Sequence, residues 1–246
     1  MIRGMSYPKG VFFMNKHHLA HATILKDNEV VTKIYKLDNQ GMRFFIYRTL
    51  FSVPFYFLLI LIAAFVWISR QPTFPFYWLL LLAFGYHFMF PHSLKQYHGA
   101  EHKVFSYHGK KTLDALERVR ASSIVNRNCS TNLAVTFYIV FLIGWWPLGG
   151  HLAALVALIA GWAIPRFLKP MDQKVLFPIS AFLQRRVTTT EPETRHLKAA
   201  LLAYISLIRN EAVTEQMLLE EKRLEQEREQ IKQREERILE TEYREI

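Results

Sequence analysis

Four long apolar runs in the middle of this 246-residue chain constrain its fold more than any other feature. They extend over residues 44–68, 74–90, 132–147 and 151–165. A helix needs about 20 apolar residues to cross the hydrocarbon core of a bilayer. The last two runs are shorter and are joined by Leu148-Gly149-Gly150, which predicts a helical hairpin that either spans or re-enters the membrane. The runs therefore predict a mainly α membrane protein with four transmembrane helices. No Asp or Glu lies within them, which argues against a transporter or pump.

The Lys and Arg residues predict the orientation of these helices. Residues 1–43 contain seven of them, 91–131 contain seven and the chain from 166 contains fifteen, whereas 69–73 contains one and 148–150 none. Positive charge is retained on the cytoplasmic side of a membrane, so this alternation predicts a multi-pass protein with both termini in the cytoplasm. The topology accounts for the net charge of +10, and we therefore expect no nucleic-acid partner. A single cysteine excludes an intramolecular disulfide framework.

The N-terminal segment, residues 1–43, is predicted to be cytoplasmic and β-rich. Two stretches rich in Val, Ile, Thr and Tyr, Leu19–Lys26 and Glu29–Leu37, flank the pair Asp27-Asn28. Asp and Asn tolerate tight turns, so this arrangement predicts a small β-hairpin. His17, His18 and His21, which lie just before or within the first stretch, are interpreted as solvated surface histidines, with metal binding as the alternative.

The membrane region, residues 44–168 with the cytoplasmic loop 91–131, is followed by two further segments. Apolar and basic residues alternate within 169–193, which predicts an amphipathic segment that lies on the membrane surface, held by anionic lipid, or packs against a core. Residues 194–246 are predicted to form one long charged cytoplasmic helix. An apolar residue recurs every seven positions from Met217, which leaves open a solvated single helix or a thin coiled-coil seam for an oligomer or partner.

The most informative local motif is H-x-x-E-H in the loop between the second and third runs. His98 and His102 are four residues apart, so both imidazoles lie on one face of a helix and could bind one zinc ion. Glu101 could act as the general base that activates a metal-bound water, and Cys129 is the candidate third ligand. The spacing alone also allows these side chains to hydrogen-bond within the loop, with Cys129 as a small apolar residue.

The residues around this motif resemble a known family. Tyr97–Val104, with the sequence YHGAEHKV, resembles the signature of the YqhQ-type bacterial membrane proteins, an uncharacterised family often described as predicted metal-dependent enzymes. The resemblance extends over about residues 10–180 and implies a divergent member located in the bacterial cell membrane. The family's second motif, His-Pro-Arg-Cys-Gly-Thr, corresponds to Asn126–Thr131, where only the cysteine and threonine remain. If the family's histidine is a ligand, Asn126 is a poor replacement, because an amide oxygen binds zinc weakly beside imidazole and thiolate.

Two functions from different classes are consistent with these features. The first, favoured by the degraded second motif, is a membrane adaptor or scaffold that presents a basic cytoplasmic face and a long helical arm to partner proteins. It would serve membrane-protein insertion, translocation or quality control, with membrane lipids, other membrane proteins or a second copy of the chain as partners, and no cofactor is expected. The alternative is a membrane-bound zinc-dependent hydrolase, with Glu101 as general base and zinc on His98, His102 and Cys129.

Overall fold

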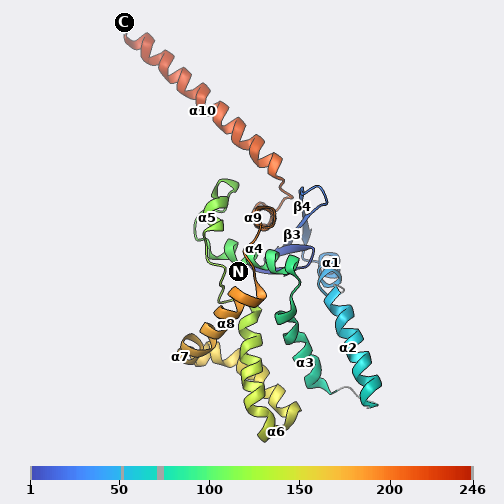
Figure 1. The fold of residues 1–246 in the computed structure, drawn as a ribbon. Helices are drawn as coiled ribbons and strands as arrows, with labels where there is room; N and C mark the ends of the chain where they lie inside the picture. The colour runs from blue at the N-terminus through green and yellow to red at the C-terminus, as the bar shows by residue number, and fades with distance from the viewer. Residues whose placement is uncertain (1, 51–52, 71–74, 245–246) are drawn as a thin grey trace.

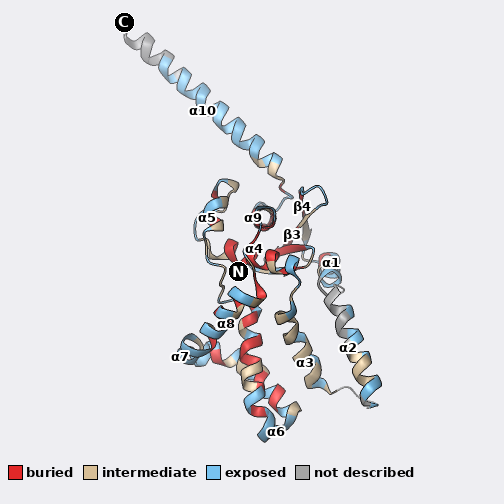
Figure 2. Ribbon diagram, in the orientation of Figure 1, coloured by how far each residue is buried: buried red, intermediate tan, exposed pale blue. Residues whose placement is uncertain are grey.

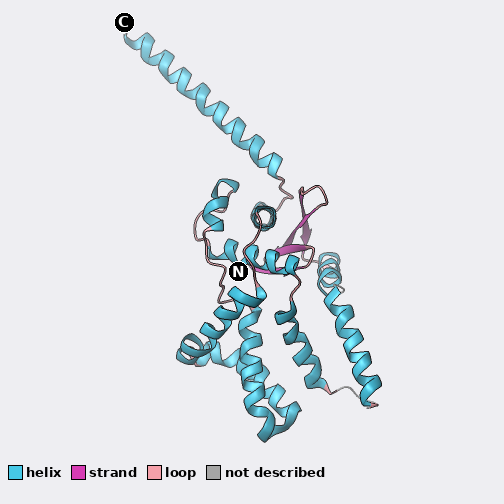
Figure 3. Ribbon diagram, viewed as in Figure 1, coloured by secondary structure: helices cyan, strands magenta, loops and turns pink. Residues whose placement is uncertain are grey.

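A four-stranded antiparallel sheet forms the N-terminal part of the protein in the computed structural model, which describes residues 2–50, 53–70 and 75–244 (Figures 1 and 3). The strands are β1 (Arg3–Tyr7), β2 (Gly10–Met14), β3 (His18–Ile24) and β4 (Val30–Lys36), and they neighbour one another in sequence order. Each successive pair is antiparallel, so the sheet is a simple meander.

The predicted hairpin is confirmed as β3 and β4, in which every residue of β3 has a partner in β4. Asn28 in the connecting turn has a φ of 66°, a left-handed conformation that Asn adopts more readily than most residues. The prediction was wrong in extent, because β1 and β2 extend the hairpin into a four-stranded sheet. These two strands are five residues long and contain Gly, Ser and Met, so their sequences carry little of the β-branched pattern that marks a strand.

Three helices enclose this sheet: α1 (Asn39–Leu50), α4 (His92–Ser106) and α9 (Thr194–Arg209). Val11 and Phe13 of β2 share a buried core with α4 and α9 on one face. Phe12 points to the other face, where its ring contacts Phe44 and Phe45 of α1 with centroid distances of 6.1 and 5.5 Å. Burial of the Phe12 and Phe13 side chains, both fully buried, stabilises the fold by about 1.5–3 kcal/mol each, so both faces of the sheet contribute to the core.

The apolar runs form α2 (Val53–Ser69), α3 (Phe76–Gly85), the 3-10 helix η1 (Tyr86–Met89) and α6 (Ser130–Phe167). Among the described residues, α6 alone is long and apolar enough to cross a membrane, so the prediction of four transmembrane helices is wrong. The first run is divided between α1 and α2, with residues 51–52 outside the described part of the chain. The second run yields only ten α-helical residues, a rise of about 15 Å against a hydrocarbon core of about 30 Å. The multi-pass topology and cytoplasmic termini derived from the four runs have no support here, and α6 supports membrane association only.

Helix α6 reverses direction at Gly149, which has φ 70° and ψ 165°. This conformation is almost restricted to glycine, and it divides the helix into two halves that pack against each other. A methyl group added at Gly144 would lie 3.4 Å from Cβ of Ala153, and Leu133 lies directly against Gly161. The two halves are therefore antiparallel, and together they form the helical hairpin that the sequence predicts (Figure 1).

The segments on either side of α6 are also helical. The link from α4 contains the 3-10 helix η2 (Leu113–Ala115) and α5 (Leu116–Arg120), and the chain after α6 forms α7 (Lys169–Met171), the π-helix η3 (Asp172–Leu176), α8 (Phe177–Leu183) and the π-helix η4 (Gln184–Thr188). The elements from α7 to η4 follow one another without a break and pack beside α6. Helices α2, α3 and α6 extend to the same side of the sheet in Figure 1.

The predicted single C-terminal helix is divided into α9 and α10 (Glu215–Arg244). Asn210 ends α9 in the left-handed conformation, with a φ of 57°, and so breaks the helix. Helix α9 is buried in the core, whereas α10 extends away from it on the side opposite to α6 (Figures 1 and 2). Three ion pairs, Lys198–Glu215, Arg209–Glu221 and Lys222–Asp114, hold the beginning of α10. Residues 219–234 are all exposed. The solvent-exposed arm therefore begins at α10 and not at Thr194.

Candidate metal centre

The two histidines of the H-x-x-E-H motif lie in the middle of α4, where every residue from Leu94 to Val104 except Lys95 is buried. Gly99 lies between the histidines and weakens helix propensity, but the packing requires it. A Cβ atom at this position would lie 2.3 Å from the carbonyl oxygen of Thr190. The backbone N–H of Thr190 also donates to the carbonyl of Lys95 at 3.3 Å, so the chain leading into α9 fixes α4 against its neighbours.

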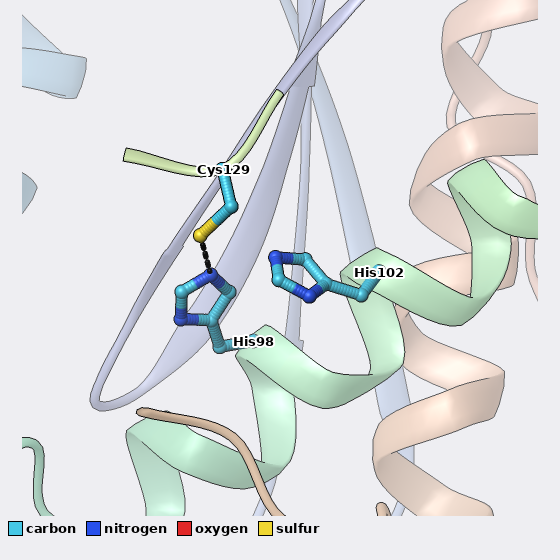
Figure 4. Close-up of side chains that lie close together, drawn as sticks. All are labelled: His98, His102 and Cys129. Carbon is cyan, nitrogen blue, oxygen red and sulfur yellow. Dashed lines mark hydrogen bonds between the residues drawn. The ribbon is translucent and has the colours of Figure 1, made fainter. Parts of the chain in front are cut away.

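Cys129 lies close to both histidines, as the sequence predicted (Figure 4). The three side chains are buried, and the ligand atoms they offer lie within 4.8 Å of one another. Sγ of Cys129 is 3.3 Å from Nε2 of His98, and the His98 and His102 rings have a centroid distance of 4.3 Å. Cys129 is also the N-cap of α6, with the N–H of Thr131 donating to Sγ at 3.4 Å. The group therefore joins α4 to the N-cap residue of the α6 hairpin and could hold a metal ion.

A hydrogen bond orients the second histidine. Nδ1 of His102 lies 2.6 Å from the carbonyl oxygen of Ile124, in the link that leads to Cys129. A carbonyl can only accept, so Nδ1 carries the proton and Nε2 keeps its lone pair. This arrangement, in which one ring nitrogen bonds to a backbone carbonyl and the other is free to bind a metal, is the usual way in which proteins orient a histidine ligand.

Burial sets the protonation states of the group. Desolvation, together with the nearby His102 and His87, holds the pKa of His98 well below its usual 6.5. Burial likewise lowers the pKa of His102 to about 4, so both imidazoles are neutral at neutral pH and can donate a lone pair. Burial raises the pKa of the Cys129 thiol to about 11, so the sulfur is protonated without a metal, and a metal that binds it must displace that proton.

Glu101 occupies a neighbouring face of α4 and is directed towards β1. Its carboxylate accepts a hydrogen bond from Oγ of Ser6 at 2.5 Å and lies against Gly4, where any side chain would collide with it. Among the described residues, Glu101 is not one of the side chains whose ligand atoms converge. Burial raises the pKa of Glu101 to about 7, partly offset by the bond from Ser6, so this carboxyl can hold or release a proton near neutral pH.

The link that carries Cys129 is held by polar residues that the sequence analysis did not identify. Gln184 of η4 is fully buried; its Oε1 accepts from the N–H of Asn126 at 2.8 Å and its Nε2 donates to the Asn126 carbonyl at 3.1 Å. The side chain of Asn126 accepts from the N–H of Asn128 at 2.9 Å, so it shapes the turn and supplies no ligand atom. The only sequence signal for this role was a glutamine within an otherwise amphipathic segment.

Lys103, which follows the motif, is a second anchor for the same link. Its ammonium group is buried and donates to the carbonyl oxygens of Arg120 and Ser122. It also pairs with Glu191 at 2.8 Å, although that carboxylate is largely exposed. His21, by contrast, is a buried residue near Tyr7 and lies outside the metal centre, so its interpretation as a solvated histidine was wrong.

Comparison with protein families identifies the chain. The sequence model of the family described as protein of unknown function DUF1385 matches residues 1–210. The chain belongs to the DUF1385 family. The match includes the sheet, the α6 hairpin, α9 and all three side chains of the candidate metal centre of this DUF1385 protein, whereas α10 lies outside it. No curated protein and no solved structure matches the chain.

Proposed function

We propose that this DUF1385 protein is a membrane-associated scaffold in which one zinc ion, bound by His98, His102 and Cys129, joins the sheet domain to the α6 hairpin. The observation that carries the proposal is the convergence of three buried ligand atoms within 4.8 Å, supplied by two segments about 30 residues apart in sequence. Surface histidines and cysteines meet by chance, but three buried ones with an oriented imidazole are typical of a built site.

The donor set fits zinc better than other common metals. Imidazole and thiolate are borderline-soft ligands that suit Zn²⁺, whereas Mg²⁺ and Ca²⁺ require oxygen ligands. Ligand atoms about 2.0–2.3 Å from a tetrahedral zinc lie roughly 3.3–3.8 Å from one another. The Sγ to Nε2 separation of 3.3 Å between Cys129 and His98 is already in this range, and the three ligand atoms, which lie within 4.8 Å of one another, would close around a bound zinc ion.

The scaffold role follows from where the centre lies. The metal would fix the N-cap residue of α6 to α4, and α4 contacts both the sheet and α9. Helix α10 then extends from this rigid unit with its charged surface exposed, where it is available to other membrane proteins or a second copy of the chain. The excess of Lys and Arg in 91–131 and after 166 is the sequence feature that favours the cytoplasmic side of a bacterial cell membrane for the residues that flank α6.

The motif at Tyr97–Val104 and the retained Cys129 support a finer placement as a divergent YqhQ-type protein. The loss of the histidine at position 126 is compatible with zinc binding, because Asn126 forms a turn and three ligands are present without it. A water molecule or a further group would complete the coordination.

Metal analysis of the full chain purified in detergent tests the proposal. We expect about one zinc per chain, lost in His98→Ala, His102→Ala and Cys129→Ser. The exposed His108, on the loop after α4, provides the matched control, and His108→Ala should retain zinc. In the cobalt-substituted protein, a thiolate-to-metal charge-transfer band should disappear in Cys129→Ser. A wild-type protein that takes up no stoichiometric zinc or cobalt after reconstitution would refute the metal centre.

A zinc-dependent hydrolase is the second candidate, and one observation favours it specifically. Glu101 has a pKa raised to about 7 by burial and lies on the same helix as two ligands, which suits a general base near neutral pH. Three protein ligands also leave a fourth position for water, as in catalytic zinc sites. Its hydrogen bond with Ser6, directed towards β1, and the burial of the whole group favour the scaffold instead.

Anion binding to the cobalt-substituted protein separates the two functions. In a hydrolase, azide or acetohydroxamate displaces metal-bound water and shifts the visible spectrum, and Glu101→Gln changes the pH at which that water ionises while retaining the metal. In a scaffold, the spectrum is insensitive to both anions, and chelation of the metal lowers the unfolding temperature. An anion-sensitive spectrum would make the hydrolase the preferred function.

A further inference from the structure

An exposed apolar stripe begins at the last residue of α6 and continues along the helical segment that follows it. Its members are Phe167, Met171, Val175, Ile179 and Phe182, which are 41–70% exposed. Successive members are three or four residues apart, and the intervening π-helical turns accommodate the repeated spacing of four, so they lie along one side of the segment. A water-soluble amphipathic helix places such residues towards the core.

The buried side of the same segment includes three polar residues. Ser180, Gln184 and Thr188 are all fully buried, beside Leu176 and Ala181. Ser180 donates to the side chain of Asn132, and Thr188 is hydrogen-bonded to Thr131 at 3.3 Å. The segment therefore buries hydrogen-bonded polar side chains while five larger apolar side chains stay outside. An apolar stripe left outside in this way indicates that the exposed side faces an apolar environment.

The residues before the stripe indicate what that environment is. Trp162 and Arg166 lie near the end of α6, the helix that could cross a membrane. The Arg166 guanidinium lies 4.7 Å from the centre of the Trp162 ring, which contacts the Phe167 ring at a centroid distance of 5.7 Å. Tryptophan and arginine concentrate where the hydrocarbon core meets the head groups. The stripe therefore begins at the level of the membrane surface.

Basic residues accompany the stripe. Lys169, Lys174, Arg185 and Arg186 are exposed, and none of them forms an ion pair within the part of the chain that the structure describes. Asp172, the acidic residue of the segment, is paired with Arg127 at 3.5 Å. The segment therefore presents four positive charges beside an apolar side, the combination that binds anionic lipid surfaces.

We propose that residues 169–188 form an interfacial helical segment on the surface of the bilayer, continuing the stripe that begins at Phe167, the last residue of α6. The five stripe residues insert at the boundary of the acyl chains, and Lys169, Lys174, Arg185 and Arg186 bind the phosphate groups of anionic phospholipids. The helix also positions the metal centre, because its buried Gln184 holds the link that leads to Cys129. Lipid binding by this segment does not depend on whether zinc is bound.

A photocrosslinking experiment with the full chain in nanodiscs tests the position of the stripe. The bilayer contains phosphatidylcholine and phosphatidylglycerol, and benzoylphenylalanine replaces Phe182. We expect lipid adducts by mass spectrometry. The same probe at Arg223, exposed on α10, should give none. A Phe182 probe that crosslinks to no lipid, or only to protein, overturns the proposal.

Charge neutralisation tests the head-group preference. Lipids that remain bound after release from the nanodisc are counted by native mass spectrometry. Each basic residue near an anionic surface contributes about fivefold in affinity, so neutralising all four with glutamine should lower the enrichment of phosphatidylglycerol by at least about tenfold. The matched control neutralises four exposed basic residues of α10, namely Arg223, Arg228, Lys232 and Arg234, and should keep the enrichment. Equal enrichment in both variants overturns head-group binding, and the crosslinking result stands even if the first variant fails to fold.

Discussion

Acidification should destabilise this protein through His21, which lies between the sheet and α1. Its side chain is 4% exposed, with Nε2 2.8 Å from the Tyr7 hydroxyl, the Phe12 ring at a centroid distance of 4.7 Å, and Nδ1 buried without a partner. Burial, reinforced by the positive charges of Arg48 and Lys33, lowers the pKa of His21 from 6.5 to about 4. The imidazole is therefore neutral in the folded protein down to low pH.

The sign and size of the effect follow from this shift. Between about pH 6.5 and pH 4 the unfolded chain binds a proton on His21 that the folded chain does not, so stability falls as the pH falls through this window. A lowering of about 2.5 pKa units corresponds to about 3 kcal/mol at 1.36 kcal/mol per unit. For a chain of this size, that loss lowers the unfolding temperature by roughly 6–12 °C.

Thermal unfolding of wild-type protein and His21→Phe in detergent, at steps from pH 7 to pH 4, measures the effect. At pH 7 the variant should lose about 1 kcal/mol, because Tyr7 loses its partner. At pH 4 it should unfold at a higher temperature than the wild type. Burial also lowers the pKa of His102 and His196 to about 4, but both are present in both proteins and cancel in the difference. Identical pH profiles for wild type and His21→Phe would refute the reasoning.

Three substitutions test the packing around the metal centre and the hairpin by the same unfolding assay. Lys103→Met removes a buried charged donor from two carbonyls of the link, so it should cost about 3 kcal/mol, whereas Lys95→Met should cost little; equal effects would show that the anchor is unimportant. Gly149→Ala forces a side chain into a conformation with φ 70° and should cost about 1–3 kcal/mol, and an unchanged unfolding temperature would argue against the reversal of α6. Gly99→Ala should cost at least about 1–3 kcal/mol by collision with the Thr190 carbonyl, and a neutral effect would contradict the close packing on α4.

The local elements that sequence reasoning predicted correctly are those whose signal is contained in a few neighbouring residues. The β3–β4 hairpin follows from alternating β-branched residues around a turn that Asn28 can adopt. The reversal of α6 follows from a glycine pair between two apolar runs. The spacing of His98 and His102 fixes both imidazoles on one face of any helix that contains them, so these two candidate ligands could be predicted from the sequence.

Predictions that depended on the length of a helix or on contacts between residues far apart in sequence were less accurate. Hydropathy counts apolar residues and does not detect where a helix ends. Four apolar runs therefore predicted four transmembrane helices, whereas the described residues include one helix that is long and apolar enough to cross a membrane. Asn210 divides the predicted C-terminal helix into α9 and α10. Only the packing of α9 against the sheet shows that α9 belongs to the core and is not part of the exposed arm. The sequence allowed residues 169–193 to lie either on a membrane surface or against a core. It could not predict the burial of Gln184, because that burial depends on contacts made only in the folded chain.

The sequence by itself determined the chemistry available to this protein: two imidazoles at helical spacing, one thiol, and apolar segments flanked by positive charge. The tertiary structure decided which of these groups meet. Cys129 reaches the histidines because the link after α4 is held by Lys103 and Gln184. The polar side chains at 180, 184 and 188 face inwards because their partners lie on that link and at the beginning of α6. Contacts between residues far apart in sequence depend on how whole elements pack, and periodicity within one element carries no information about the surface that it will meet.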